Sequence, residues 1–160
     1  MTTSENHRFA ELIEETASVE ETHELARRLG RMLAPGDFLA LIGPLGAGKT
    51  ALVQGLAEVL GVEGAVTSPT FVLMRLHRGE PALCHVDAYR LASAAEILDL
   101  GIEDWAEESI VALEWADTVP DALPEQRLEI RLEYTDDGRR IHFRGMGPRY
   151  AAIVEQMRKQ

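Results

Sequence analysis

Cysteine is nearly absent from this sequence, because Cys84 is the only one among 160 residues. One thiol cannot build a disulfide framework, and it cannot supply the several ligands of a cysteine-based metal site. Proteins without disulfides are typical of reducing compartments, so we expect a cytoplasmic protein. Cys84 itself is expected to be a small core residue.

Positive charge is also scarce, since 16 lysines and arginines stand against 27 aspartates and glutamates and leave a formal net charge of −11. A protein that holds nucleic acid through many phosphate contacts needs basic side chains. The composition therefore argues against such binding by this chain alone, and any contact with RNA is expected to be indirect.

Long apolar runs are missing as well. The N-terminus is polar and acidic instead of a basic start followed by an apolar run, and no stretch has enough consecutive apolar residues to cross a bilayer. The sequence contains no internal repeat, linker or low-complexity tract. At this length we expect a single domain over residues 1–160, large enough to bury a core.

The most specific motif is a glycine-rich stretch. Residues 43–50 read Gly-Pro-Leu-Gly-Ala-Gly-Lys-Thr and fit the pattern of a phosphate-binding loop. In such a loop the glycines let backbone N–H groups approach phosphate oxygens, the lysine meets the outer phosphates as a point charge, and the threonine hydroxyl can ligate magnesium. The residues predicted here to bind a nucleotide are Gly43, Leu45, Gly46, Ala47, Gly48, Lys49, Thr50 and Ala51.

The segments on either side of this loop support the match. Residues 37–42 have the apolar character of a buried strand, and apolar residues then recur at helical spacing over residues 52–60, before a plausible stop at Gly61. The alternative is a glycine-rich turn that binds nothing. A strand, a loop and a helix in register favour the phosphate loop.

Helix starts can be recognised at two other places. Ser18 and Glu21 have the spacing of a capping box, and the apolar face that follows reaches Leu33. Ser93 and Glu96 repeat this spacing ahead of a short helix. Apolar or alternating patterns predict an edge strand over residues 9–16, a hairpin of 71–77 with 82–86, and a buried central strand over 110–113. They also predict a second hairpin, of 128–134 with 141–143 and with one solvent-exposed face, and a last helix over 150–160.

Two acidic residues follow apolar strands, where a phosphate-loop protein needs its second magnesium anchor. Asp87 comes directly after Val86, and Glu114 comes after residues 110–113. Either carboxylate could ligate the ion, hold one of its waters or orient the attacking water. We assign them jointly: the predicted catalytic residues are Lys49, Asp87 and Glu114, and the predicted metal ligands are Thr50, Asp87 and Glu114.

Other polar and aromatic residues near these motifs allow more than one interpretation. Thr67, Ser68 and Thr70 could form a loop that senses the γ-phosphate, with Thr67 at the nucleotide, or their hydroxyls could satisfy their own turn. His85 is interpreted as a packed strand residue, and Trp115 as an aromatic residue that covers the edge of the site.

Four motifs succeed one another in a recognisable order. They are Gly-Pro-Leu-Gly-Ala-Gly-Lys-Thr at 43–50, Thr-Ser-Pro-Thr-Phe at 67–71, His-Val-Asp-Ala-Tyr-Arg-Leu at 85–91 and Leu-Glu-Trp-Ala at 113–116. Together they resemble the bacterial TsaE (YjeE) family, the ATPase of tRNA threonylcarbamoyladenosine biosynthesis. The likeness covers most of the chain. One departure is Pro44, where the family usually has aspartate; this position contributes backbone, so the phosphate site is hardly affected.

The resemblance implies an α/β protein with a P-loop NTPase fold, that is, a mainly parallel central sheet flanked by helices, with a C-terminal β-hairpin. It implies ATP and Mg²⁺ as cofactors, with magnesium held by Thr50 and Glu114 and with Asp87 close by. In the family, TsaD modifies the adenosine beside the anticodon, and the TsaE-like subunit binds the TsaB–TsaD assembly and hydrolyses ATP. We therefore expect an Mg-dependent ATPase, weak alone and stimulated by TsaB and TsaD, which meets tRNA only indirectly and binds no membrane.

Two other functions are compatible with a phosphate loop. A small-molecule kinase would also need an acceptor pocket and usually an arginine-bearing lid. Arg139, Arg140 and Arg144 lie in or beside the C-terminal hairpin, where a solvated strand face is the simpler account. A nucleotide-gated binding module without turnover is the second alternative, and the acidic residues Asp87 and Glu114 favour hydrolysis over it.

Overall fold

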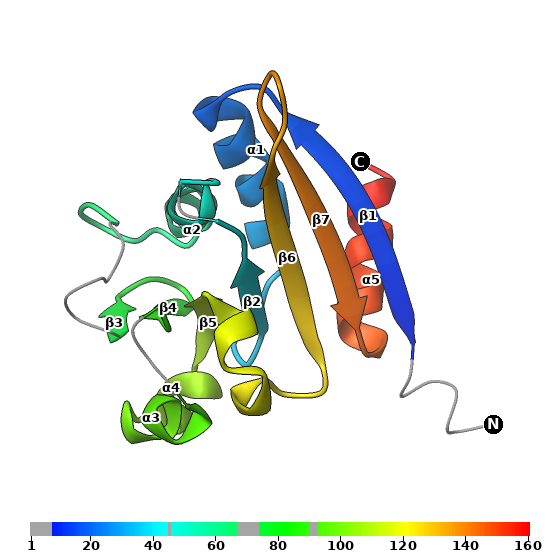
Figure 1. Cartoon of the computed structure of the whole chain (residues 1–160). Coiled ribbons are helices and arrows are strands. Elements are labelled where there is room, and N and C mark those ends of the chain that lie inside the picture. Colours follow the sequence, from blue (N-terminus) through cyan, green and yellow to red (C-terminus); the bar gives the residue numbers. More distant parts are fainter. Residues whose placement is uncertain (1–7, 45, 67–73, 90–92) are drawn as a thin grey trace.

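A computed structural model describes residues 8–44, 46–66, 74–89 and 93–160 (Figure 1). Its elements are β1 (Phe9–Thr16), α1 (Val19–Gly30), β2 (Phe38–Ile42), α2 (Lys49–Val59), β3 (Met74–His77), β4 (Ala82–Asp87), α3 (Ala94–Asp99), α4 (Glu103–Ala106), β5 (Ser109–Glu114), two short 3₁₀ turns η1 (Ala116–Thr118) and η2 (Pro120–Ala122), β6 (Arg127–Tyr134), β7 (Arg139–Met146) and α5 (Pro148–Arg158).

The seven described strands form one mixed sheet in the order β1-β7-β6-β2-β5-β4-β3. The pairings of β6 with β2, β2 with β5 and β5 with β4 are parallel, whereas those of β1 with β7, β7 with β6 and β4 with β3 are antiparallel. The predicted α/β class is confirmed, but the sheet is not mainly parallel. Hairpin partners at both ends add as many antiparallel pairings as the centre has parallel ones.

Helices cover both faces of the central strands. Along β2, Leu39 and Leu41 join the core under α1, α2 and α5, while Ala40 and Ile42 join the second core, under α3 and η1. This alternation follows from the two-residue period of a strand. All six residues of β5 are buried, as predicted for a central strand. Cys84 is a buried core residue of β4, also as predicted.

The N-terminal elements agree with the sequence patterns. The predicted edge strand is β1, and Ser18 caps α1 by accepting a hydrogen bond from the Glu21 backbone N–H at 3.1 Å. The helix ends at Gly30, so Met32 of the predicted apolar face lies in the turn that follows, and Leu33 comes directly after that turn.

Several element boundaries differ from the sequence predictions. Asp37 precedes β2, and its carboxylate binds Arg149 and the Ala34 N–H. Of the predicted strand over residues 71–77, only the part from Met74 is described, and it forms the expected hairpin with β4. Ser93 lies at the N-cap of α3 without a side-chain capping bond.

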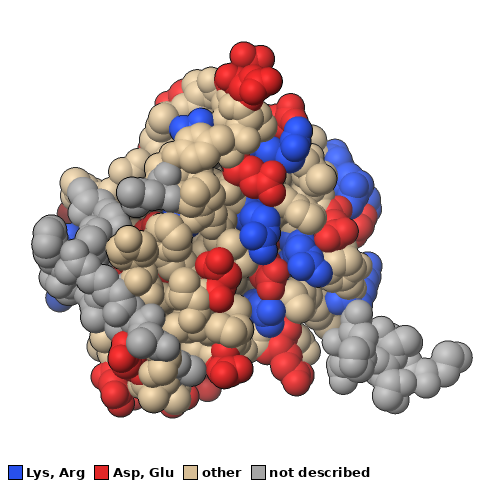
Figure 2. Space-filling view, in the orientation of Figure 1, with Lys and Arg blue, Asp and Glu red and all other residues tan. Residues whose placement is uncertain are grey.

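The C-terminal hairpin of β6 and β7 is confirmed, and its outward face is rich in charge (Figure 2). The last helix begins two residues earlier than predicted, at Pro148. Proline is favoured in a first helical turn because its missing N–H would have no helical partner there. None of the described helices combines the length and the apolar character needed to span a bilayer.

Candidate functional site

The candidate site lies where three neighbouring parallel strands end. β2 runs directly into the glycine-rich loop, and α2 begins at Lys49 as the loop closes. β5 pairs with β2, β4 pairs with β5, and all three strands run parallel, so their last residues reach the same edge. This is the edge at which open α/β sheets keep their ligands.

Glycine is required in the loop for two different reasons. Gly46 has φ of +79°, which side chains rarely adopt, and an added Cβ would lie 2.6 Å from the Tyr134 hydroxyl. At Gly43 an added Cβ would lie 2.6 Å from the Leu132 carbonyl oxygen. The loop is therefore packed tightly against the end of β6.

Lys49 is held at the mouth of the loop although it is only 5% exposed. Its Nζ donates hydrogen bonds to the carbonyl oxygens of Gly43 at 2.5 Å and Pro44 at 2.9 Å. The same ammonium group lies 4.0 Å from the centroid of the Trp115 ring. These contacts fix a positive charge at the position where the pattern predicts an outer phosphate.

Burial and the neighbouring carboxylates act in opposite directions on the pKa of Lys49. Burial lowers the pKa of the Lys49 ammonium, and the carboxylates of Glu114, Asp87 and Asp117 oppose that shift. An anionic ligand in this place would add a further negative charge and favour the charged form of the lysine.

The two predicted carboxylates lie side by side. Asp87 and Glu114 are the last residues of β4 and β5 and are partners in the parallel register of these strands. They are 4% and 3% exposed. The Asp87 Oδ1 accepts a hydrogen bond from the Tyr89 backbone N–H at 2.8 Å. The sheet thus brings together the two acidic residues that the sequence indicated.

His85 makes a contact that the sequence did not reveal. It is fully buried in β4, as expected for a packed strand residue, and its Nε2 lies 2.5 Å from Oε2 of Glu114. His77 of β3 lies nearby, with 6.3 Å between the two ring centroids.

Trp115 and Tyr89 form an aromatic border beside the carboxylates. Trp115 has φ of 61° and ψ of 36°, a left-handed conformation that is unusual for a large side chain. Its ring lies against Tyr89, with 4.9 Å between centroids. The interpretation of Trp115 as an aromatic at the edge of the site agrees with this position.

These residues share one cleft of about 760 Å³. Its near side holds predicted site residues, namely Gly46, Gly48, Lys49, Thr50, Ala51, Asp87 and Glu114, together with the aromatic residues Tyr89 and Trp115. Gly43 and Ala47 belong to the same loop but do not line the cleft. Leu45 and Thr67, with Ser68 and Thr70, lie outside the described residues.

The opposite wall of the cleft was not foreseen. It consists of the junction between β1 and α1 and the turn between β6 and β7, through residues 16–19, Thr22 and 135–139. The two segments touch, because an added Cβ at Gly138 would lie 2.0 Å from the Thr16 carbonyl oxygen. β6 runs parallel to β2, so its end reaches the same edge as the loop. No local sequence pattern indicates that β6 and β2 become neighbours.

The three arginines of the hairpin therefore have two different environments. Arg139 lines the cleft, stacks on the Tyr134 ring at 4.4 Å and donates to the Gly46 carbonyl at 3.4 Å, so the solvated-face interpretation is wrong for it. Arg140 and Arg144 lie on the outward face, 3.0 and 3.3 Å from carboxylates of β1, as a solvated strand face predicts.

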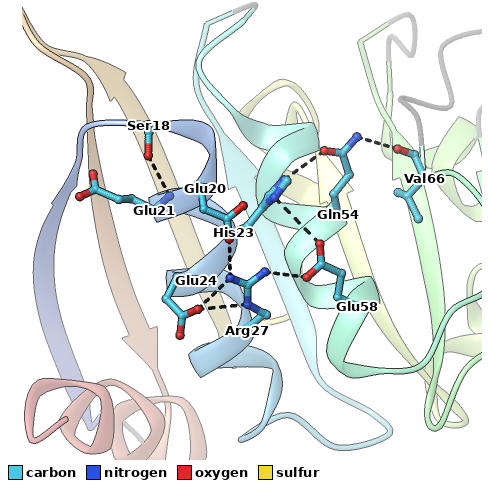
Figure 3. A network of polar contacts seen from close by, with 9 residues as sticks. All are labelled: Ser18, Glu20, Glu21, His23, Glu24, Arg27, Gln54, Glu58 and Val66. Atoms are coloured by element: carbon cyan, nitrogen blue, oxygen red, sulfur yellow. Dashed lines mark hydrogen bonds and ion pairs between the residues drawn. The ribbon is translucent and has the colours of Figure 1, made fainter.

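A polar network joins α1, α2 and the chain that leads toward Thr67 (Figure 3). The Gln54 side chain lies 3.2 Å from His23 Nε2 and donates to the Val66 carbonyl at 2.8 Å. Arg27 of α1 binds Glu58 of α2 at 2.6 Å. The network links α2 both to α1 and to the segment that ends at Val66.

The donor set of the cleft fits magnesium better than a softer metal. The described residues contain no group of three or more His, Cys, Asp or Glu side chains that could hold a metal ion. The Thr50 hydroxyl and the carboxylates of Asp87 and Glu114 supply hard oxygen donors on the same cleft. Magnesium keeps several waters and needs only one or two carboxylates from a protein.

Comparison with known proteins agrees with the motif order. Residues 16–141 match the profile of the family "Threonylcarbamoyl adenosine biosynthesis protein TsaE". A TsaE protein of Streptomyces coelicolor is 44% identical over 137 residues, which cover 80% of this chain and 93% of that one. A TsaE protein of Bacillus subtilis is 37% identical over 145 residues, covering 89% and 90%. The crystal structure of Bacillus subtilis YdiB superposes with a TM-score of 0.82 at 32% identity, covering 96% of this chain and 97% of that one. The chain belongs to the TsaE family.

Proposed function

We propose that this chain has the P-loop NTPase fold and that it binds and hydrolyses ATP with Mg²⁺ in the cleft. One observation carries the proposal: Lys49, Asp87 and Glu114 are buried together on one cleft at the start of α2. Protein contacts hold each of them in place: Lys49 donates to loop carbonyls, Asp87 accepts from the Tyr89 N–H, and Glu114 contacts His85. A metal-bound triphosphate offers a negative partner to the lysine and a positive one to the carboxylates.

The loop and α2 bind the phosphates. The first backbone N–H groups of a helix have no helical partner, and the helix dipole favours negative charge at this end. α2 has no acidic residue in its first turn, so no side chain competes with a phosphate there. Lys49 needs to turn only from the loop carbonyls toward the cleft to contact an outer phosphate.

Thr50, Asp87 and Glu114 are the residues that would hold magnesium. A bound Mg²⁺ would neutralise charge that develops on the phosphates during hydrolysis. The protein's own contribution is to hold two carboxylates at fixed strand ends. One of them can orient the attacking water by accepting its proton in a hydrogen bond, while Lys49 balances the added charge.

The opposite wall gives the remainder of the nucleotide a place to bind. The cleft continues past the loop to the β1–α1 junction and the β6–β7 turn. The preference for ATP over GTP rests on the family resemblance, since the sequence has no guanine-reading motif of the Asn-Lys-x-Asp type.

The biological role follows from family membership. The named relatives are tRNA threonylcarbamoyladenosine biosynthesis proteins. We assign this chain to the same modification, on the adenosine next to the anticodon, as a cytoplasmic subunit that acts through TsaB and TsaD. The net charge of −11 suits a subunit that meets tRNA only indirectly.

Phosphate release tests this assignment. The rate should be measured for the isolated chain and with purified TsaB and TsaD, at fixed salt and magnesium, with binding checked in the same samples by pull-down. We expect slow hydrolysis alone and faster hydrolysis with the partners. Equal rates despite binding would reject partner activation, and nucleotide binding without any turnover would favour a nucleotide-gated module.

A coupled assay separates the ATPase from a kinase. ATP consumption should be compared with and without candidate small-molecule acceptors. Consumption that requires an acceptor and transfers phosphate to it would replace the ATPase assignment.

A further inference from the structure

His85 is a fully buried titratable residue beside the cleft, and the hydrolysis proposed above assigns it no role. Its side chain is 0% exposed, and its Nε2 lies 2.5 Å from Oε2 of Glu114. Glu114 lines the cleft, whereas His85 does not. The contact that links the histidine to the cleft among the described residues is the one with Glu114.

The hydrogen-bonding pattern favours one tautomer of the imidazole ring. A carboxylate oxygen accepts, so the Nε2–H tautomer donates to Glu114. Nδ1 has no hydrogen-bond partner among the described residues. In this tautomer Nδ1 is an acceptor, which is easier to leave without a partner than an N–H group.

We propose that His85 is a positioning residue, which fixes the orientation of the Glu114 carboxylate toward the metal and water side of the cleft. The proposal rests on the proposed ATPase function. A glutamate has three rotatable side-chain bonds, and one hydrogen bond from a rigid, buried ring restricts the carboxylate to one orientation. Only Oε2 of Glu114 takes part in this contact, so Oε1 can bind a metal ion or a water molecule in the cleft. Partners that orient a metal-binding carboxylate in this way act strongly on affinity and activity.

The chain contains a matched control for this role. His77 lies on the neighbouring strand β3 and is 9% exposed. It is adjacent to His85, with 6.3 Å between ring centroids, yet no contact of His77 with Glu114 or the cleft is found among the described residues. The two histidines share a buried setting and differ in their access to Glu114.

Two amide substitutions at His85 distinguish the hydrogen bond to Glu114 from the mere presence of a polar side chain. In His85→Gln the amide nitrogen takes about the place of Nε2 and can still donate to Glu114. In His85→Asn it takes about the place of Nδ1 and falls short of the carboxylate. His77→Asn serves as the control, and thermal melting establishes that each variant is folded.

We expect His85→Asn to lower kcat about 10- to 100-fold and to weaken Mg²⁺ binding to the nucleotide complex about 10-fold. ATP affinity measured in EDTA should remain unchanged, because loop amides and Lys49 hold the phosphates. His85→Gln should recover most of both losses, and His77→Asn should match the parent protein. Mg²⁺ binding is measured by calorimetry, independently of turnover.

The proposal is overturned if folded His85→Asn and His85→Gln show the same kcat and the same Mg²⁺ affinity. If the Asn variant does not fold, His85→Met removes the donor at similar volume, and unchanged kcat and Mg²⁺ affinity in it would overturn the proposal equally. A parent protein that neither hydrolyses ATP nor binds Mg²⁺ with it would instead reject the proposed function. Hydrolysis that is lost in Glu114→Gln but kept in His85→Asn would reject the inference alone.

Discussion

The two halves of the sheet differ in where they place their charged side chains. The loop half, β2, β5 and β4 with α2, buries Lys49, Asp87 and Glu114 on the cleft. In the hairpin half, formed by β1, β7 and β6 with α5, acidic and basic side chains intermingle on the outward face of the strands, with Arg139 at the cleft as an exception (Figure 2). There Glu11 and Glu15 of β1 lie opposite Arg144 and Arg140 of β7.

This contrast separates function from scaffold. Burying a charge costs several kcal/mol in real proteins unless it is compensated, whereas an exposed pair contributes little in either direction. The other buried charge among the described residues, Asp37, has a bidentate partner in Arg149, at 2.6 and 2.7 Å. The cleft charges of the loop half also have protein contacts, and they differ from Asp37 in lining a cleft that a ligand can enter. The hairpin half supports them by packing and forms part of the cleft wall through residues 135–139.

The largest effect should come from the core of the hairpin half. Phe143 is 0% exposed at the middle of β7, so Phe143→Ala should lower the free energy of unfolding by about 3–5 kcal/mol. Phe9 on the adjacent strand β1 is 48% exposed, and Phe9→Ala should cost less than about 1 kcal/mol. Urea denaturation measures both. Similar losses would mean that burial does not distinguish the two positions.

The next effect concerns hydrolysis in the loop half. Glu114→Gln and Asp87→Asn should each lower kcat about 100-fold, which corresponds to about 3 kcal/mol, because the geometry of metal and water is lost. ATP affinity should change much less, since the loop still holds the phosphates. Glu129→Gln on β6 is the control, with a carboxylate paired to Arg127 outside the cleft. Normal hydrolysis in both cleft variants would refute the carboxylate assignment.

A third change tests the phosphate loop itself. Lys49→Ala removes a charge-assisted phosphate contact worth about 2–3 kcal/mol and should weaken ATP binding roughly 30- to 150-fold, as measured by calorimetry. Lys159 is the only other lysine in the chain and is exposed near the C-terminus, so Lys159→Ala is a natural control. Unchanged affinity in Lys49→Ala would contradict a phosphate site in this loop.

The loop half was the more predictable half, because its signals are local. The strand, the glycines and the helix that starts at Lys49 are contiguous, and Asp87 and Glu114 each end an apolar run. Their register pairing depends on which strands become neighbours, which no local pattern specifies. For the same reason, alternation along β4 could place His85 and Asp87 on one face without revealing that Glu114 accepts from His85.

The opposite wall of the cleft was hidden because it is built from residues far apart in sequence. Residues 16–19 lie at the end of the first strand and the start of the first helix, whereas residues 135–139 lie between the sixth strand and the start of the seventh. The assembled sheet brings the two segments together. The pattern gave the hairpin and its wet face correctly. It could not show that Arg139, at the start of β7, turns to the cleft while Arg140 turns outward.

The smallest effect is expected on the outward face of the hairpin half. Arg140 and Glu15 form an ion pair at 3.0 Å, but their side chains are 48% and 64% exposed. Water screens such a pair, and ordering two long side chains costs entropy, so a double-mutant cycle with Arg140→Ala and Glu15→Ala should give a coupling of only about 0.2–1 kcal/mol. The coupling should shrink further in high salt, because exposed charges are screened.

ATP hydrolysis should stay at the parental rate in all three variants, since neither residue lines the cleft. A coupling above about 2 kcal/mol would place the outward face among the main determinants of stability. A loss of hydrolysis in folded variants would show that the two halves do not divide function from scaffold.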